Sequence, residues 1–325
     1  MKTPISLIID DPAPVISVYY EHAYRPFTED GRPLVPTYSN ELLFKFCDII
    51  EKHGIKGKFS IVPMPGNKGD IVNGLKGVPA EDLNEWLNTV KARVLPRFTP
   101  CPEMLTHSNA VDLATGASLN MNEESFASAQ TVETLTPYIK KALTLHKEAG
   151  IHSIGVTSPW NFGADNEEVY KASVSKAVYE VTGSKVAWYF LHVITKEKNV
   201  KPWIALEEDG RTLVTIPSTT RDAIWETISS TDTSDEYVSR VADSLITEDG
   251  KEGYIIRSVE KGNHVVFHTH WQSLMSNGLG TGLLVLDEVC RRINKNLGDK
   301  VTWMSFEEIV DLVMANKDDY RNALV

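Results

Sequence analysis

Two adjacent aspartates follow an apolar run near the start of the chain. Residues 5–9, ISLII, are typical of a strand that is buried on both faces, and Asp10 and Asp11 stand at its carboxyl end. An Asp-Pro pair also begins turns, so a simple turn is the alternative interpretation. Neighbouring carboxylates repel each other, which raises the pKa of one of them unless a cation lies beside them. A divalent metal ion would be such a cation, and the carboxylate that does not bind it could act as a general base.

Histidines stand at the ends of two further predicted strands. We expect a short strand in PEMLTHS, residues 102–108, with His107 at its far end, and another in NHVVFHTHW, residues 263–271, which carries His268 and His270. Side chains alternate between the two faces of a strand, so at most one of the last two histidines should point to the centre of a barrel. Asp and His together suit Zn²⁺ and similar ions, and a catalytic site takes about three protein ligands.

The rest of the pattern predicts the elements that position these residues. Strands alternate with amphipathic helices, such as residues 40–53 and 128–149, which favours parallel pairing. About seven such units predict an α/β fold, an irregular (β/α) barrel with about seven parallel strands. We expect one catalytic domain over residues 1–325, with a Gly- and Pro-rich insertion around residues 64–100. The active site of a parallel barrel lies at the carboxyl ends of its strands, where the aspartates and histidines above are expected.

Composition excludes several classes of function. The formal net charge is -11, with 44 acidic and 33 basic residues, which argues against nucleic acid or an anionic membrane as the main partner. A small-molecule or carbohydrate substrate fits better. No apolar run approaches the roughly 20 residues that span a bilayer. We therefore expect a soluble protein, cytoplasmic as the chain stands, and secreted or periplasmic if a signal peptide was removed.

Several residues are expected to have structural roles only. Ser305 and Glu308 match a capping box for a final helix. His53 and His146 lie near predicted helix ends, where we expect solvated cations. The cysteines lack the spacing of metal ligands, which indicates buried apolar thiols at Cys47, Cys101 and Cys290.

The order of the motifs resembles that of the polysaccharide deacetylase family, the NodB-homology domain of carbohydrate esterase family four. The resemblance runs from Leu7 to about Leu312. Its first half consists of Ile8-Ile9-Asp10-Asp11, the strand KGKFSIVP at residues 56–63, and Thr106-His107-Ser108. Its second half consists of Ser158-Pro159-Trp160, Val266-Phe267-His268, and the closing segment KVTWMSFEEIVDLV at residues 300–313.

The resemblance implies distinct roles for the residues at the strand ends. Asp10 would be the catalytic base, Asp11 and His107 would be metal ligands, and His268 would act as the acid toward the leaving group. The family has its second ligating His four residues after the first, but Val111 stands there in this chain. The third ligand is therefore open. Asp112 is our first candidate, and the others are His22 and His270.

Two more differences concern the substrate side of the expected site. The family has an Arg before its Pro-Trp motif, whereas this chain has Val156 and Thr157. The segment TRDAIW, residues 220–225, is similar to the family's Asp-x-x-Asp-Trp motif. The resemblance thus implies a substrate groove formed by Pro159, Trp160, Asp222 and Trp225.

We therefore expect a metal-dependent hydrolase that removes an N- or O-linked acetyl group from a carbohydrate, with a divalent metal ion, zinc, as its cofactor. One alternative is a hydrolase of non-peptide C–N bonds in a small molecule, similar to allantoinase-like enzymes of the same fold. Another is a sugar-binding relative without catalysis. Bound metal together with release of acetate from an acetylated sugar distinguishes the first function from the others.

Overall fold

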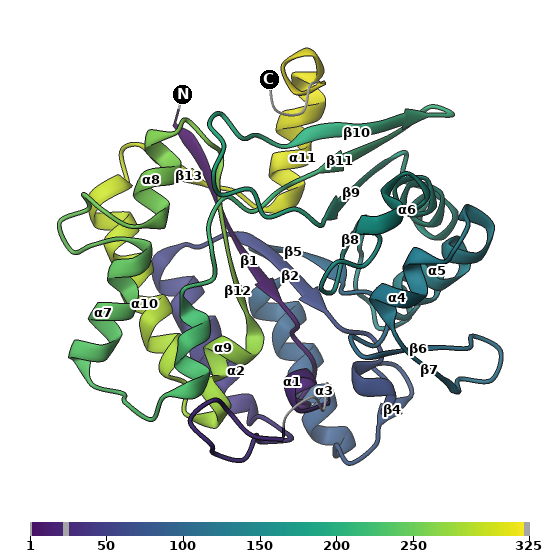
Figure 1. Cartoon of the computed structure of the whole chain (residues 1–325), viewed down its shortest axis with the longest axis horizontal. Helices are drawn as coiled ribbons and strands as arrows, with labels where there is room; N and C mark the ends of the chain where they lie inside the picture. The colour runs from purple at the N-terminus through teal and green to yellow at the C-terminus, as the bar shows by residue number, and fades with distance from the viewer. Residues whose placement is uncertain (1, 22–25, 322–325) are drawn as a thin grey trace.

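The computed structural model describes residues 2–21 and 26–321, and its centre is a curved layer of parallel strands (Figure 1). One sheet has the order β12 (Val265–His270), β1 (Thr3–Asp10), β2 (Gly57–Ile61) and β5 (Phe98–Pro102), and β13 (Val301–Trp303) also pairs with β1. All of these pairs are parallel. Ile5, Leu7, Ile8 and Ile9 have no exposed surface, as the continuous apolar run of β1 predicts.

A second sheet continues this layer. Its order is β10 (Trp203–Glu208), β11 (Arg211–Thr215), β9 (Val186–Phe190) and β8 (Gly155–Thr157), and only the β10–β11 pair is antiparallel. A parallel bridge between Glu103 and Thr157 joins β5 to β8. After β11, the N–H of Thr219 donates to the carbonyl of Val266 in β12. In the described part of the chain, the strands β1, β2, β5, β8, β9, β11 and β12 thus lie side by side in chain order, and the prediction of an α/β fold with about seven parallel strands is confirmed.

β5 and β8 are joined by a single bridge and do not form a regular ladder, and the reason is local. The N–H groups of alternate strand residues face the same neighbour, and the N–H of Glu103 donates to Ile61 of β2. Pro100 and Pro102 therefore turn their nitrogens toward β8, where proline has no hydrogen to donate, so a regular ladder cannot form. The expectation of a strand over residues 102–108 is wrong, because β5 ends at Pro102 and His107 lies in the following loop.

The interior of the strand layer is filled by side chains from several strands. Ile8, Trp188 and Val266 belong to one buried cluster, and Phe306 of α11 (Phe306–Ala315) packs on Trp188 with ring centroids 5.0 Å apart. Gly155 makes room for this tryptophan, since a Cβ atom there would lie 2.1 Å from the indole ring. Figure 1 shows α11 near the N-terminus, at the end of the layer where β1 begins. The carboxyl ends of the strands lie at the opposite end.

Helices cover the outside of the strands. Figure 1 shows α2 (Asn40–His53), α7 (Asp235–Leu245) and α10 (Thr281–Leu297) together on the side of β12, and α5 (Val132–Glu148) with α6 (Glu167–Thr182) on the side of β8 and β9. The other α-helices are α1 (Val18–Glu21), α3 (Ala80–Thr89), α4 (Glu123–Ser128), α8 (Tyr254–Glu260) and α9 (Trp271–Met275). Short 3-10 or π turns are η1 (Pro65–Asn67), η2 (Val90–Val94), η3 (Ala164–Asn166), η4 (Ile224–Ser229), η5 (Ser276–Gly278) and η6 (Lys317–Tyr320). Two hairpins, β3 (Gly69–Asp70) with β4 (Gly74–Leu75) and β6 (Asn109–Val111) with β7 (Ser118–Asn122), complete the described elements.

The region around residues 64–100 connects β2 to β5. It contains the β3–β4 hairpin, α3 and η2, and Trp86, Val90 and Val94 are buried in the largest hydrophobic cluster. These side chains attach the connection to the helical layer outside β2. None of the helices in the two described ranges is long and apolar enough to cross a membrane.

Most of the expected structural roles are confirmed. Ser305 and Glu308 form both hydrogen bonds of the capping box of α11, and all three cysteines are buried. The expectation of solvated histidines is wrong. His146 is fully buried, with its ring nitrogens 2.9 Å from Ser153 Oγ and 3.0 Å from the carbonyl of Ile61. The side chain of His53 is only 8% exposed and lies 2.7 Å from Asp287.

Candidate active site

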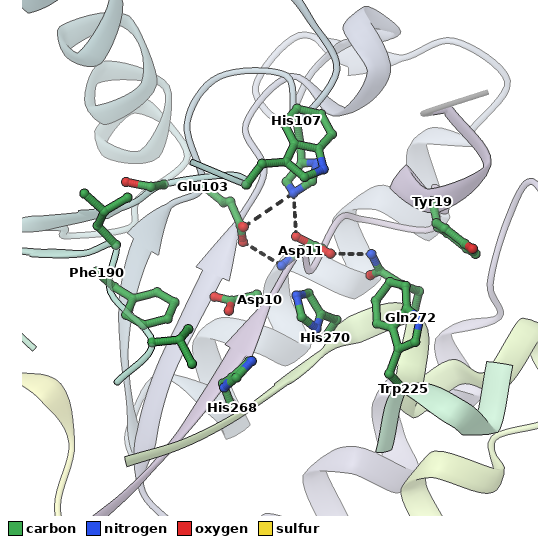
Figure 2. A pocket seen from close by; sticks show the side chains of 14 residues that line it. Asp10, Asp11, Tyr19, Glu103, His107, Phe190, Trp225, His268, His270 and Gln272 are labelled. Carbon is green, nitrogen blue, oxygen red and sulfur yellow. Dashed lines mark hydrogen bonds and ion pairs between the residues drawn. The ribbon is translucent and has the colours of Figure 1, made fainter. Parts of the chain in front are cut away.

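A cavity of about 520 Å³ opens at the carboxyl ends of the strands (Figure 2). This volume is within the range of small-molecule sites, roughly 300 to 1,000 Å³. Asp10 at the end of β1 and His270 at the end of β12 are register partners, so parallel pairing brings them to the same edge. Three carboxylate side chains and three histidines line the cavity: Asp10, Asp11, Glu103, His107, His268 and His270.

Asp11, Glu103 and His107 form a compact group on one side of the cavity. All three are buried, and one ligand atom from each lies within 4.8 Å of the other two. Nε2 of His107 is 2.7 Å from Asp11 Oδ1 and 3.5 Å from Glu103 Oε1. The N–H of Asp11 donates to Glu103 Oε2 at 2.6 Å, and Gln272 donates to Asp11 Oδ2. Two carboxylates and one imidazole are thus held close enough to share one ion.

The electrostatics of this group favour added positive charge. Burial raises the pKa of Glu103, and the charges of Asp11 and Asp10 raise it further, to about 8. Burial would lower the pKa of His107, but Asp11 and Glu103 raise it well above its ordinary value. Burial alone would raise the pKa of Asp11, but His107 holds it well below the usual range. The raised pKa shows that Glu103 does not ionise readily beside the charges of Asp11 and Asp10, so a bound cation would favour its carboxylate form.

The loop that carries His107 is organised by a second buried carboxylate. Glu123 has no exposed surface, and its oxygens accept the N–H groups of Leu105, Thr106 and His107 at 2.9 to 3.1 Å. The hydroxyl of Tyr138 donates to the same carboxylate at 2.7 Å. These four hydrogen bonds fix the backbone just where the imidazole leaves it.

The backbone is unusual at three residues of the site. Asp11, His107 and Trp160 have φ angles of 66°, 50° and 49°. Non-glycine residues avoid this left-handed region, at a cost of about 1 to 3 kcal/mol each, and such residues cluster at functional sites. Asp11 directly follows β1, Trp160 lies three residues after β8, and His107 lies in the loop after β5, so the left-handed conformation occurs where the chain turns.

Asp10 has a buried cationic partner. Lys58 on β2 has no exposed surface, and its Nζ donates to Asp10 Oδ1 at 2.5 Å, to Ser60 Oγ at 2.6 Å and to Thr157 Oγ1 at 2.6 Å. The ring of Phe190 lies over the same Nζ, 4.5 Å away. All three ammonium hydrogens thus have acceptors, and the Asp10 carboxylate is anchored through one oxygen while it lines the cavity.

His270 forms a separate pair with Asp222. Its Nδ1 lies 2.8 Å from Asp222 Oδ2, and Trp225 packs edge-on against the ring with centroids 4.9 Å apart. Burial would lower the pKa of His270, but the hydrogen bond to Asp222 and the charges of Asp11, Asp222 and Asp10 raise it to about 10. The bond at Nδ1 leaves Nε2 as the nitrogen available to the cavity.

His268 has a different environment although it lies two residues away. Its Nδ1 is 2.8 Å from Ser218 Oγ, and burial together with the neighbouring His270 lowers its pKa. The expectation that only one of the two histidines faces the barrel centre is wrong, because both line the cavity. Their ring centroids are 5.8 Å apart, because residues two apart on a strand point to the same face.

The structure brings together most of the residues expected at the site. Asp10, Asp11, His107, Trp160, Trp225 and His268 all line the cavity. Asp222 lies behind His270, and Pro159 is buried next to Ser158, which does line the cavity. His22 lies outside the described residues.

Asp112 is the expected residue that the structure places elsewhere. Its Oδ1 accepts the N–H groups of Ala114 and Thr115 and the hydroxyl of Thr115, in the exposed turn between β6 and β7. Its carboxylate is therefore engaged in that turn and does not line the cavity. Glu103 stands beside Asp11 and His107 instead, so Asp112 is replaced by Glu103 in the candidate ligand set.

Sequence reasoning missed Glu103, Lys58 and Gln272. Glu103 directly follows β5 and precedes His107 by four residues, so the rule on strand ends would have found it if β5 had been placed correctly. Lys58 interrupts the apolar strand GKFSI, and a lysine inside a buried strand indicates a buried partner. No pattern in the sequence connects Gln272 to Asp11, which lies 261 residues earlier.

The residues present fit a divalent metal ion. Two carboxylates and one imidazole make a three-ligand set with room for a water or substrate oxygen, as in catalytic sites of zinc and similar ions. Oδ1 of Asp11 and Nε2 of His107 are 2.7 Å apart on two buried side chains, so one ion could contact both atoms.

Comparisons with known proteins identify the fold. No protein-family model matches the sequence, and no curated protein does. A protein of Mycobacterium smegmatis, provisionally assigned as a polysaccharide deacetylase, has a TM-score of 0.56 at 12% identity over 100% of this chain and 93% of its own. A 4-alpha-glucanotransferase of Thermococcus litoralis has a TM-score of 0.48 at 14% identity, over 96% and 40%. A peptidoglycan deacetylase of Bacillus subtilis has a TM-score of 0.44 at 8% identity, over 98% and 95%. The first similarity shows that the chain has a fold of the polysaccharide deacetylase type.

Proposed function

We propose that this chain, which has a polysaccharide deacetylase-like fold, is a metal-dependent hydrolase that removes an N- or O-linked acetyl group from a carbohydrate. The observation that carries the proposal is the grouping, in one cavity, of a three-ligand cluster, a separate carboxylate on β1 and a carboxylate-bound histidine on β12. Metal, base and acid are the three parts that hydrolysis of an amide or ester needs.

Asp11, Glu103 and His107 would hold the metal ion, and zinc suits this donor set. Such an ion, when bound, supplies Lewis acidity toward the acetyl carbonyl and toward a water molecule. Gln272 orients Asp11 through its second oxygen, and Glu123 fixes the backbone of His107. These supporting contacts keep the ligand atoms in place before an ion binds.

Asp10 is the proposed general base. It lies next to Asp11 in the chain and lines the cavity, but it is not part of the three-ligand group. Lys58 and Ser60 both donate to its Oδ1. These contacts orient the carboxylate toward the cavity, where it would accept a proton from the attacking water.

His270 is the proposed general acid, in place of His268. The bond between Asp222 and Nδ1 of His270 fixes the ring and directs Nε2 to the cavity, where it would protonate the departing amine or alcohol. The raised pKa of His270 keeps its proton available, whereas the pKa of His268 is lowered. In this proposal Asp222 and Trp225 act through His270, and His268 contacts the substrate or its water.

The walls of the cavity suit a sugar ring. Tyr19, Trp160 and Trp225 contribute aromatic side chains, and Phe190, Leu191 and Val193 form an apolar side. Binding sites commonly combine such apolar walls with a few oriented polar groups. Trp160 lies beside His107, with ring centroids 4.7 Å apart, so a ring stacked on it would bring its substituent to the three-ligand cluster.

One observation supports hydrolysis of a small-molecule C–N bond as a second candidate. The proposed ligand set contains Glu103 instead of a second histidine, so it departs from the motif that carried the carbohydrate assignment. The chemistry would be unchanged, and only the substrate would differ.

The test combines metal analysis with product analysis. We expect purified protein to bind about one divalent ion per chain. It should release acetate from a panel of N- and O-acetylated glucosamine oligomers. Bound metal with turnover of small amides or ureides, but without acetate release, would favour the second candidate. Sugar binding without turnover of either panel would identify a non-catalytic relative and contradict the proposal.

A further inference from the structure

A second cavity, of about 220 Å³, lies between α8 and the segment that follows β9. Four cationic side chains line it, together with hydroxyl groups that include those of Thr219 and Ser258. The four cations are Lys196, Arg221, Arg257 and Lys261. No carboxylate lines this cavity among the described residues.

None of the four cations has an acidic partner in the described part of the chain. In residues 2–21 and 26–321, no carboxylate oxygen lies within 4.0 Å of any of their charged nitrogens. The chain has 44 acidic and 33 basic residues, so cations are outnumbered and acidic partners are plentiful elsewhere. Four unpaired cations line one cavity although the net charge of the chain is negative. They create a local positive potential there.

Part of this cationic surface is held in place by other contacts. Nζ of Lys261 donates to the carbonyls of Thr195 and Lys196, at 2.8 and 3.1 Å, which leaves one ammonium hydrogen for a ligand. The guanidinium of Arg257 lies over the ring of Tyr254, 4.7 Å from its centroid, with its edge available. The cations are thus partly oriented before any ligand binds.

The floor of the cavity is polar and rigid. Ser258 and Thr219 are 2% and 4% exposed, and Ser258 Oγ donates to Thr219 Oγ1 at 2.9 Å. Thr219 Oγ1 in turn lies 3.1 Å from the carbonyl of His264. These contacts lie where the segment after β11 meets β12.

We propose that this cavity binds a phosphate group. Guanidinium groups bind phosphate through paired N–H bonds, and lysines add point charge, which is the combination found here. The volume of about 220 Å³ accommodates a phosphate or a small phosphate monoester. The proposal is independent of the acetyl chemistry, because none of the four cations lines the catalytic cavity.

The phosphate could belong to one of two sources. Val193 lines the catalytic cavity and Thr195 lines the second one, and residues two apart are at most about 7 Å apart. Arg221 likewise directly precedes Asp222, the partner of His270. The cavities are thus neighbours, so the phosphate is either part of the substrate or a separate ligand beside the active site.

The probe is inorganic phosphate, titrated at constant ionic strength and followed by calorimetry. We expect saturable binding with a dissociation constant on the order of 1 mM or lower. Arg257→Gln should weaken it by about tenfold or more. Arg240→Gln is the matched control, because Arg240 also lies over a tyrosine, Tyr237 at 4.9 Å, but pairs with Glu226 and does not line the cavity. The control should bind phosphate like the wild type.

A phosphorylated N-acetylhexosamine distinguishes the two sources. If the phosphate belongs to the substrate, this sugar phosphate should bind more tightly than phosphate alone, and Trp160→Ala should weaken only the sugar phosphate. If the ligand is separate, both should bind equally, and Trp160→Ala should change neither. Absence of saturable binding, or binding that Arg257→Gln leaves unchanged, would overturn the proposal. Phosphate binding that is lost in Asp11→Ala but kept in Arg257→Gln would place the anion at the metal cluster and would overturn it too.

Discussion

Two histidines of the catalytic cavity, His107 and His270, have carboxylate partners, and Figure 2 shows His107 with Asp11 and Glu103, above His270. In one group, His107 has two carboxylate neighbours, Asp11 and Glu103. In the other group, His270 has a single carboxylate partner, Asp222, in a hydrogen bond of 2.8 Å. In the first group the Glu103 carboxyl holds a proton that a metal ion could replace, whereas in the second the contact with Asp222 favours a proton on His270.

A third buried histidine shows what happens without any carboxylate. The ring nitrogens of His146 pair with a hydroxyl and a carbonyl, and burial lowers its pKa to about 4, although the hydrogen bond to Ile61 opposes this. Burial lowers the pKa of all three rings, so the raised pKa values of His107 and His270 come from the carboxylates around them. The comparison predicts that changes to these carboxylates will have distinct and separable effects.

The largest effect, on metal affinity, is expected at the cluster of Asp11, Glu103 and His107. Glu103→Gln removes one of three ligands, so metal affinity should fall by more than about 100-fold, beyond what loss of an outer contact causes. Asp112→Asn is the matched control and should leave metal affinity unchanged, because its carboxylate is engaged in the β6–β7 turn. Competition with a chromogenic chelator measures both variants. Loss of metal in Asp112→Asn with retention in Glu103→Gln would restore Asp112 as the ligand.

A smaller effect, on turnover alone, is expected at the pair of His270 and Asp222. His270→Gln should reduce kcat by about 10² to 10⁴-fold, the usual contribution of a general acid, while metal content stays the same. His268→Gln should reduce kcat less. His53→Gln, which removes a carboxylate-paired histidine outside the cavity, is the control. A larger loss of kcat in His268→Gln than in His270→Gln would return the acid role to His268.

Stability should reveal the pairing of Asp10 with Lys58. Lys58→Met leaves a buried carboxylate without its cation and should lower the free energy of unfolding by about 3 to 5 kcal/mol. The double variant Lys58→Met/Asp10→Asn should recover most of this loss, because both charges are removed together. Lys56→Met, which breaks a partly exposed pair with Glu308, should cost at most about 1 kcal/mol. Urea unfolding measures all three, and additive losses in the double variant would show that the two side chains do not interact.

The histidine without a carboxylate makes stability depend on pH. An unfolded histidine binds a proton below a pH of about 6.5, whereas folded His146 stays neutral down to a pH of about 4. The unfolded state therefore binds more protons between these values, so the free energy of unfolding falls as pH falls through this window. The contribution is on the order of 3 kcal/mol. Urea unfolding at pH 7 and pH 4.5 should show a smaller pH effect in His146→Gln than in the wild type, and an equal effect would contradict the assignment.

The strand-end rule explains how much of the site could be predicted from sequence. Asp10, Asp11 and His268 follow continuous apolar strands, so their place at the cavity could be inferred from local pattern alone. β5 contains two prolines, which normally argue against a strand, so the strand was expected too late in the chain, at residues 102–108. Glu103 was therefore not recognised as a residue at the end of a strand. The prolines are tolerated because their nitrogens face β8, with which β5 forms no regular ladder. This arrangement depends on the tertiary structure and cannot be read from the sequence alone.

Other residues were missed because their partners are distant in the chain. A lysine in a buried strand indicates a buried partner for Lys58, but only the pairing of β1 with β2 shows that this partner is Asp10. Asp112 was expected at the site because it stands near His107, but the chain turns away between them. The burial of His146 could have been predicted, because Leu135, Ile139, Ala142 and His146 follow the helical spacing of one apolar face.

The most direct test of the central claim compares Asp10→Asn with Asp11→Asn. Metal stoichiometry and acetate release are measured for each variant beside the wild type. Asp10→Asn should keep about one ion per chain and lose turnover by about 10² to 10⁴-fold, because its amide cannot accept the proton but can still accept the hydrogen bond of Lys58. Asp11→Asn should lose both metal and turnover. An Asp10→Asn protein with full activity, or an Asp11→Asn protein that binds metal like the wild type, would contradict the division of roles between the two aspartates.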